Sequence, residues 1–292
     1  MEEELIGNVL VAQSGGPTSV INSSLAGVIT EALNHDCIEE IYGALNGVEG
    51  ILNEELIDLA EESQQTVRGL RYTPGAALGT CRYKLKSEED FSRVIEVFKA
   101  HNIRFFFYIG GNDSQDTANK IAEHAAAQGY DMRVIGVAKT IDNDLPLPEG
   151  IPTFGFTSAK EMGVTIGKVI KAEASTTQNW YLLMSMGREA GHLAFEIGKG
   201  IHASMIIIPE MFNKTQITID KIVRLIISSM IKRRIVGQKF GVVVVGEGIF
   251  HFLQDEDIAS SGITFDYDAH GHPELSEVSK AHVISKILKN RL

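Results

Sequence analysis

Residues 105–138 read FFFYIGGNDSQDTANKIAEHAAAQGYDMRVIGVA, and the order of patterns in this stretch predicts the fold class. A β-rich run over 105–109 leads into a glycine turn, an amphipathic stretch over 114–127 and a second β-rich run over 134–138. A strand, a helix and a second strand in this order are typical of a parallel βαβ unit. We therefore expect a parallel sheet with helices packed on its faces.

The same alternation continues on both sides of this stretch. It predicts an α/β protein with two Rossmann-like lobes, each a mostly parallel sheet flanked by helices. A breaker segment at 142–152, with three prolines and a glycine, separates the lobes, and we expect domains over 1–145 and 146–292. The remaining expected strands are 9–12, 41–45, 180–186, 203–208 and 241–245, and the remaining expected helices are 19–33, 88–100, 158–173 and 219–232.

Composition and charge exclude several classes of protein. The 292 residues carry a formal net charge of −11, so the basic footprint of a nucleic-acid binder is missing and no nucleic-acid partner is expected. The apolar runs fall far short of the ~20 residues of a membrane span, and the N-terminus is acidic where a secretory signal would be basic. We therefore expect a cytoplasmic protein with no membrane partner. The two cysteines, Cys37 and Cys81, lack metal-site spacing and predict plain thiols.

Three predicted strands end in turns that could hold an anion, because ligands of open parallel sheets bind beyond the carboxyl ends of the strands. The first turn contains Gly15 and Gly16, whose backbone could approach a phosphate, although such glycines are also common turn punctuation. The second contains Asp113 and Ser114, either of which could instead cap the following helix. The third, residues 139–144, combines a lysine, a hydroxyl and two carboxylates, against the alternative of an Asx-rich turn.

Two later strand ends carry single charged side chains between small residues. Arg188 follows Met186 and Gly187, and its planar guanidinium could clamp a phosphoryl group. Glu247 stands between two glycines and could accept a hydrogen bond from a sugar hydroxyl. A lone Arg or Glu at a strand end is more often a solvated charge, so these residues count only as part of the whole set.

Taken in order along the chain, these motifs resemble those of the 6-phosphofructokinase family. The resemblance covers nearly the whole chain and is most specific where KTIDND at 139–144 is followed by MGR at 186–188. It implies reversible phosphoryl transfer to O1 of fructose 6-phosphate, giving fructose 1,6-bisphosphate in glycolysis, with the donor on domain 1–145 and the sugar phosphate on domain 146–292. The matching motifs are 14–16, 78–82, 110–114, 139–144, 186–188 and 246–248.

The resemblance also implies a role for each matching side chain. Asp142 matches the family's general base, which takes the proton of the 1-hydroxyl, and an aspartate is ionised for this role at neutral pH. Thr140 would orient the moving phosphoryl group, and Arg188 would neutralise its charge. The expected catalytic residues are Lys139, Thr140, Asp142 and Arg188, and the expected sugar-binding residues are Thr140, Ile141, Asp142, Met186, Gly187, Arg188 and Glu247.

Two positions resemble the pyrophosphate-dependent branch of the family. The ATP-using members that this chain resembles carry glycine at two positions where this chain has Asp113 and Lys139. The Asp113 side chain would crowd and repel the α-phosphate of ATP, whereas Lys139 would compensate the charge of bare pyrophosphate. The resemblance therefore implies pyrophosphate as the donor, bound by Gly15, Gly16, Asp113, Ser114 and Lys139.

Mg²⁺ is the cofactor that the resemblance implies, with Asn112, Asp113 and Asp144 as its expected ligands. Asn112 stands where the family usually has an aspartate, so one direct carboxylate ligand is lost. Asp113 or Asp144 would have to take over its role.

The chain departs from the family pattern at two further places. No arginine lies between Lys171 and Arg188, although the family commonly has one there that reaches the sugar phosphate of a neighbouring subunit. The chain also stops at Leu292, before any segment like the family's late Gln-Arg-Gly motif, and we therefore expect a truncated member. The resemblance implies that it forms a homodimer or homotetramer. An ATP-dependent phosphofructokinase and a non-catalytic regulatory subunit of the same fold are the alternatives.

Overall fold

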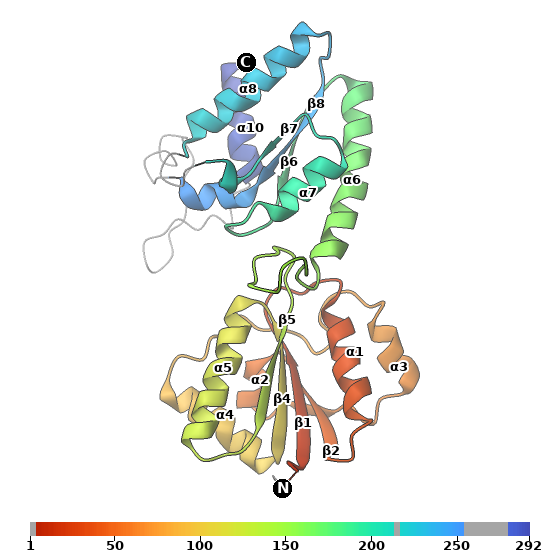
Figure 1. Cartoon of the computed structure of the whole chain (residues 1–292), viewed down its shortest axis with the longest axis vertical. Helices are drawn as coiled ribbons and strands as arrows, with labels where there is room; N and C mark the ends of the chain where they lie inside the picture. Colours follow the sequence, from red (N-terminus) through yellow and green to blue (C-terminus); the bar gives the residue numbers. More distant parts are fainter. Residues whose placement is uncertain (1–3, 213–216, 254–279) are drawn as a thin grey trace. The chain divides into compact units, whose positions relative to one another are not determined.

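The computed structural model describes residues 4–212, 217–253 and 280–292. The chain divides into two compact units (Figure 1). Unit 1 comprises Met1–Thr140 and Leu147–Gly155, and unit 2 comprises Ile141–Pro146 and Phe156–Leu292. The proline-rich segment 142–152 therefore contributes residues to both units. The domain boundary expected after residue 145 lies within this segment.

Unit 1 is built on a five-stranded sheet with the order β3-β2-β1-β4-β5. All neighbours are parallel except the edge strand β3, which runs antiparallel to β2. All seven residues of β1 are buried, because this strand lies at the centre of the sheet with helices on both faces. The strands are β1 (Gly7–Gln13), β2 (Ile38–Ala44), β3 (Leu56–Asp58), β4 (Ile103–Gly110) and β5 (Arg133–Ala138).

Helices cover both faces of this sheet, with α1 and α3 on one side and α2, α4 and α5 on the other (Figure 1). Each face of the sheet has its own hydrophobic core, because successive side chains of β1 point to opposite faces. Leu10 and Ala12 pack toward α4 and α5, whereas Val9 and Val11 pack toward α1. The helices are α1 (Ile21–Ala32), α2 (Val48–Leu52), α3 (Gln64–Leu70), α4 (Glu88–Ala100) and α5 (Asn112–Ala127).

The starts of two helices follow directly from their first residues. Helix α4 begins with a capping box, in which the Ser87 hydroxyl accepts from the Asp90 amide and the Asp90 carboxylate accepts from the Ser87 amide. Helix α5 begins one residue after Gly111, which takes the N-cap position without a side-chain hydrogen bond. The alternative in which Asp113 or Ser114 caps this helix is therefore wrong, since both lie in its first turn.

Unit 2 contains a three-stranded parallel sheet with the order β6-β8-β7. Side chains of α6 and α7 pack with Val242 and Val244 on one face, and side chains of α8 and α10 pack with Val243 and Val245 on the other. The sequence prediction of mostly parallel sheets flanked by helices is confirmed. The elements are α6 (Phe156–Thr177), β6 (Trp180–Ser185), α7 (His192–Gly200), β7 (Met205–Ile207), η1 (Pro209–Met211), α8 (Ile219–Ile235), β8 (Gly241–Gly246), η3 (Glu247–Phe252) and α10 (Lys280–Arg291).

Several short elements are absent from the sequence prediction. Helix α7 contains two glycines that mask its helical pattern. Packing explains both, because a Cβ at Gly198 would lie 2.5 Å from Ile206 and a Cβ at Gly200 would lie 2.5 Å from Val164. The strand expected over 203–208 is shorter because Pro209 begins a 3₁₀ turn. None of the helices that the structure describes combines the length and hydropathy required to cross a membrane.

Candidate functional site

The carboxyl ends of β1, β4 and β5 lie side by side in unit 1, and each carries one of the predicted anion-binding turns. The Ser114 hydroxyl, in the first turn of α5, donates a hydrogen bond of 3.0 Å to the Ser14 hydroxyl after β1. Burial raises the pKa of Tyr108 to about 12, and its protonated hydroxyl also hydrogen-bonds Ser14. The structure thus brings the first two turns together through buried hydroxyl groups.

Lys139 joins the third turn to the first. The residue is only 5% exposed, and its Nζ donates a hydrogen bond of 2.6 Å to the carbonyl oxygen of Gly16. The Lys139 amide donates to the carbonyl of Gly110, which ties the end of β5 to the end of β4. A buried ammonium group is costly unless it has polar or anionic partners, so the turns concentrate positive charge at one place in an acidic chain.

Glycines keep the space around Lys139 open. A Cβ at Gly16 would meet no heavy atom within 4 Å, and a Cβ at Gly111 would meet only the Lys139 carbonyl, at 3.8 Å. Neither glycine has a positive φ, so the protein itself does not require a bare Cα at these positions. Gly15 differs, because its φ of 76° lies in the left-handed region that favours glycine. The three turns therefore form an open, cationic cradle, defined here as residues 14–16, 110–114 and 139.

The cradle has one charged neighbour that the sequence prediction missed. The Asp113 carboxylate is exposed and forms an ion pair with Lys84, at a distance of 3.1 Å between Oδ2 and Nζ. Lys84 stands two residues beyond the motif 78–82, which is the signal that could have identified it. The charge that Asp113 presents at the cradle is therefore balanced by a neighbouring lysine.

Unit 2 holds a second cluster of predicted residues around Asp142. The Asp142 side chain is 11% exposed, and its Oδ2 lies 3.9 Å from Nε of Arg188, whose side chain is 54% exposed. The two residues come from the segment Ile141–Pro146 and from the turn after β6, both in unit 2. A largely buried carboxylate next to an accessible guanidinium can take up a proton and bind an anion at the same place.

Glu247 fixes the backbone of the Met186-Gly187-Arg188 turn. Its Oε1 accepts hydrogen bonds from the amides of Gly187 and Arg188, at 3.0 and 3.1 Å. Arg188 has a φ of 50°, in the left-handed region that non-glycine residues rarely adopt, so these two bonds hold a strained backbone in place. Met186 is exposed at the start of the same turn.

The two residues between Lys139 and Asp142 are anchored separately. The Thr140 amide donates to the carbonyl of Phe154, and the Thr140 carbonyl accepts from the Thr153 hydroxyl, all within unit 1. Ile141 packs with Phe156 and other apolar side chains of unit 2. Its side chain is therefore engaged in packing, and any contact with a substrate would come from its backbone.

The three expected metal ligands come from both units. Asn112 and Asp113 belong to unit 1, Asp144 belongs to unit 2, and Asp113 is paired with Lys84. Among the described residues no group of three or more His, Cys, Asp or Glu side chains is suited to a metal ion. Mg²⁺ needs only one or two carboxylates when phosphate and water oxygens complete its shell, and the half-buried Asp144 is compatible with that requirement.

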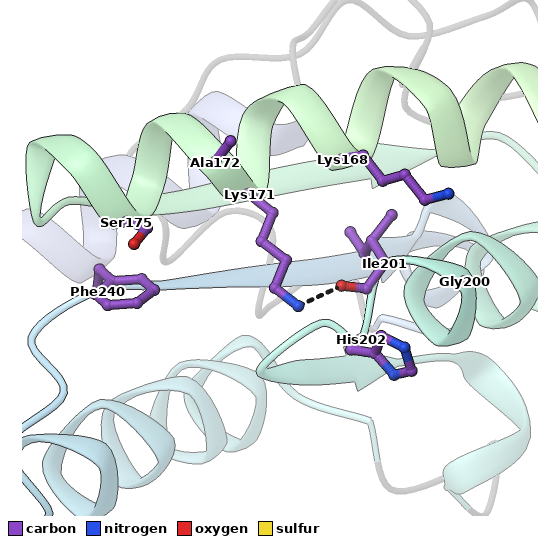
Figure 2. Close-up of a pocket in the computed structure, with 8 residues that line it drawn as sticks. All are labelled: Lys168, Lys171, Ala172, Ser175, Gly200, Ile201, His202 and Phe240. Carbon is purple, nitrogen blue, oxygen red and sulfur yellow. Dashed lines mark hydrogen bonds between the residues drawn. The ribbon is translucent and has the colours of Figure 1, made fainter.

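A separate hollow of about 500 Å³ in unit 2 contains none of the predicted residues (Figure 2). It lies between α6 and the end of α7, next to Phe240 before β8, and the Lys171 ammonium in it donates to the carbonyl of Ile201 at 2.8 Å. The predicted residues instead follow the carboxyl ends of the strands in each sheet, as expected for α/β proteins.

Comparison with protein families gives one match over nearly the whole chain, since the family described as phosphofructokinase matches residues 8–291. The pyrophosphate–fructose 6-phosphate 1-phosphotransferase of Xanthomonas campestris is 40% identical over 285 residues, 94% of this chain and 65% of that protein. The enzyme of the same name from Thermotoga maritima is 34% identical over 279 residues, 95% of this chain and 65% of that protein. The chain thus spans about 65% of the length of these curated relatives.

Solved structures give the same result for the fold. The crystal structure of the pyrophosphate-dependent phosphofructokinase from Nitrosospira multiformis matches with a TM-score of 0.76 and 34% identity. That match covers 98% of this chain and 66% of the other. A phosphofructokinase from Saccharomyces cerevisiae, at 20% identity, has a TM-score of 0.72 and supports the fold alone.

Proposed function

The chain belongs to the phosphofructokinase family, and from that premise we propose that it transfers a phosphoryl group from pyrophosphate to O1 of fructose 6-phosphate. The products are fructose 1,6-bisphosphate and orthophosphate, in a reversible reaction of glycolysis. The relatives from Xanthomonas campestris and Thermotoga maritima, which are named for this reaction, support the choice of donor and acceptor.

The open cradle of unit 1 is the observation that carries the proposal. Gly16 and Gly111 lack side chains although the protein leaves room for them, and the buried Lys139 lies beside the first turn. A small, highly charged anion explains both features, since its oxygens need close backbone approach and a cation of fixed position. We assign the pyrophosphate to this cradle, with Gly15, Gly16, Ser114 and Lys139 as its contacts and Asp113 at its edge.

The cluster around Asp142 supplies the acceptor chemistry in this proposal. The Asp142 carboxylate accepts the proton of the 1-hydroxyl while the oxygen attacks the terminal phosphorus of pyrophosphate and the bond to the leaving orthophosphate breaks. Arg188 stabilises negative charge on the transferred group, and Thr140 orients it. Met186, Gly187 and Glu247 complete the surroundings of the sugar, with the Ile141 backbone. Only two residues separate Lys139 from Asp142 in the chain, so one motif contributes to both clusters.

Mg²⁺ is part of the proposal as a group that neutralises phosphate charge when bound. Asp144 is the residue of this chain that would hold it, together with donor and water oxygens, because Asp113 is already paired with Lys84. Asn112 could contribute only a neutral oxygen. We also propose a cytoplasmic location, assembly as a homodimer or homotetramer, and a division of labour in which residues 1–145 bind the donor and residues 146–292 bind fructose 6-phosphate.

The decisive experiment measures fructose 1,6-bisphosphate formation with pyrophosphate and with ATP. The variants Gly16→Ala and Gly111→Ala are compared with Gly27→Ala, a control on the exposed surface of α1 where a Cβ also meets nothing within 4 Å. We expect all three to fold, and only the two cradle variants to lose pyrophosphate use, by about tenfold or more. Catalysis with ATP alone would show an ATP-dependent enzyme, and binding of sugar phosphate without turnover would show a regulatory subunit.

A further inference from the structure

Two side-chain amides are completely buried directly below the cradle. Gln13, the last residue of β1, and Asn22, the second residue of α1, are both 0% exposed. The Gln13 Nε2 donates a hydrogen bond of 2.9 Å to the Asn22 Oδ1. Polar groups buried this deeply destabilise a protein unless their hydrogen-bonding capacity is used, so the partners of this pair indicate its purpose.

The partners all belong to one connecting segment, residues 73–78. The Leu78 amide donates to Oε1 of Gln13 at 2.9 Å, and the Ala77 amide donates to Oδ1 of Asn22 at 2.8 Å. The Asn22 Nδ2 donates to the carbonyl of Thr73 at 2.9 Å. This segment lies in neither a helix nor a strand, so the amide pair satisfies backbone groups that secondary structure would otherwise satisfy.

The clamped segment leads directly to the cradle. Thr80 follows two residues later, and its hydroxyl donates a hydrogen bond of 2.6 Å to the carbonyl of Gly15. Gly79, between them, has a φ of 73°, and a Cβ there would lie 2.2 Å from the Asn46 side chain. The path from the amide pair to the first phosphate turn is therefore short and tightly packed.

We infer that the Gln13–Asn22 amide pair is the positioning element of the donor site, and that it sets pyrophosphate affinity by holding residues 73–80 against the Gly15-Gly16 turn. This inference rests on the proposed function, since it concerns the ligand of the same cradle. Neither amide is placed to touch pyrophosphate. Their effect is transmitted through the backbone of residues 73–80 and the Thr80 hydroxyl to the carbonyl of Gly15.

The same strand offers a matched control. Asn8, at the amino end of β1, is also a buried asparagine that fastens remote backbone: its Nδ2 donates to the carbonyl of His101, and its Oδ1 accepts from the Glu40 amide. Asn8→Ala removes two such hydrogen bonds far along the strand from the cradle. Asn22→Ala removes the bonds to residues 73 and 77 and the bond from Gln13. Both variants should therefore lose stability, but only Asn22→Ala should lose donor affinity.

The test uses isothermal titration calorimetry of pyrophosphate, together with steady-state kinetics. We expect Asn22→Ala and Gln13→Met to raise the Kd and KM of pyrophosphate about tenfold or more, with the KM of fructose 6-phosphate changed less than twofold. Asn8→Ala should leave the Kd of pyrophosphate within twofold. Equal losses in Asn8→Ala and Asn22→Ala, or no loss in Asn22→Ala and Gln13→Met, would overturn the inference.

A second measurement uses the parent protein alone and tests the same inference if the variants do not fold. Coupling between two sites is reciprocal, so saturating pyrophosphate should slow hydrogen exchange of the Ala77 and Leu78 amides in the parent protein, but not of the Glu40 amide bonded to Asn8. Unchanged exchange at Ala77 and Leu78 with pyrophosphate bound would overturn the inference alone. A parent protein that binds no pyrophosphate would overturn the proposed donor as well.

Discussion

The two clusters of predicted site residues hold their cations in opposite ways. In unit 1 the Lys139 ammonium is buried and bonded to the carbonyl of Gly16 at 2.6 Å. In unit 2 the Arg188 guanidinium is exposed and lies 3.9 Å from Asp142, while its backbone is held by two bonds to Glu247. The Lys139 ammonium is thus held in place before any ligand binds, whereas Arg188 has a fixed backbone and an exposed guanidinium.

This difference fits two kinds of ligand binding. A preorganised cation loses little conformational entropy when an anion arrives, which suits a small ligand such as pyrophosphate with few contacts of its own. An exposed arginine must be ordered by its ligand, and a sugar phosphate with many hydroxyl groups can supply the necessary contacts.

Replacing Asp142 should have the largest effect, because both clusters depend on the proton that it accepts in the proposed reaction. Asp142→Asn should lower kcat by about 10²–10⁴-fold with little change in folding or in the binding of either substrate, since an amide cannot accept the hydroxyl proton. Circular dichroism and substrate titrations provide the control. An active parent whose Asp142→Asn variant kept more than a tenth of its rate would exclude Asp142 as the base.

Replacing Lys139 or Arg188 by methionine tests the difference between the two clusters. A hydrogen bond to a charged group contributes about 1.5–3 kcal/mol, so Lys139→Met should lower kcat/KM for pyrophosphate about 10- to 100-fold. Arg188→Met should lower kcat, because Arg188 stabilises charge on the transferred group in the proposed reaction, and should also raise the KM of fructose 6-phosphate. We expect its effect to be smaller than that of Lys139→Met because the guanidinium is exposed. The comparison of the two clusters fails if Lys139→Met affects only the sugar phosphate.

The preference between pyrophosphate and ATP should change by smaller factors when Asp113 or its partner Lys84 is replaced. Asp113→Gly removes the carboxylate that would repel the α-phosphate of ATP, and Lys84→Gln removes the lysine that balances it, so the ATP/pyrophosphate ratio of kcat/KM should rise in the first and fall in the second. Exposed ion pairs contribute about 0.2–1 kcal/mol, which corresponds to changes of about 1.5- to 5-fold. Combining Asp113→Gly with Lys139→Gly should move the preference further toward ATP. Unchanged ratios in all variants would place donor selection elsewhere.

The smallest effect concerns acid stability at the start of α4. Hydrogen bonds from the Lys86 and Ser87 amides lower the pKa of Asp90 in the folded chain below its ordinary value of 3.8. A lowered pKa stabilises the fold above about pH 4, and this contribution is lost as the pH falls through the folded-state value. Asp90→Asn should therefore reduce the melting temperature at pH 7, and the difference from the parent should shrink as the pH is lowered below about 4. A difference that does not shrink as the pH falls would contradict this account.

Local patterns predicted the regular elements that carry a strong period. The runs 9–12, 105–109 and 134–138 are strands, and residues 88–100 form a helix with the predicted bounds. Helix α3 was missed because only Val67 of its residues is buried, which leaves no hydrophobic period to detect. Edge strand β3 is only three residues long and has no alternation of its own.

The sequence by itself determined the fold class, the order of the strand-end motifs and the family, because each motif is a short run of neighbouring residues and the order of the motifs is read along the chain. Only the tertiary structure decided which of these side chains meet. Lys84 pairs with Asp113, Lys139 reaches the carbonyl of Gly16, and Asn22 holds the Ala77 amide. Such contacts join residues far apart in sequence, and no periodicity encodes them, since they exist only after the packing of the sheet and its helices brings the strand ends together.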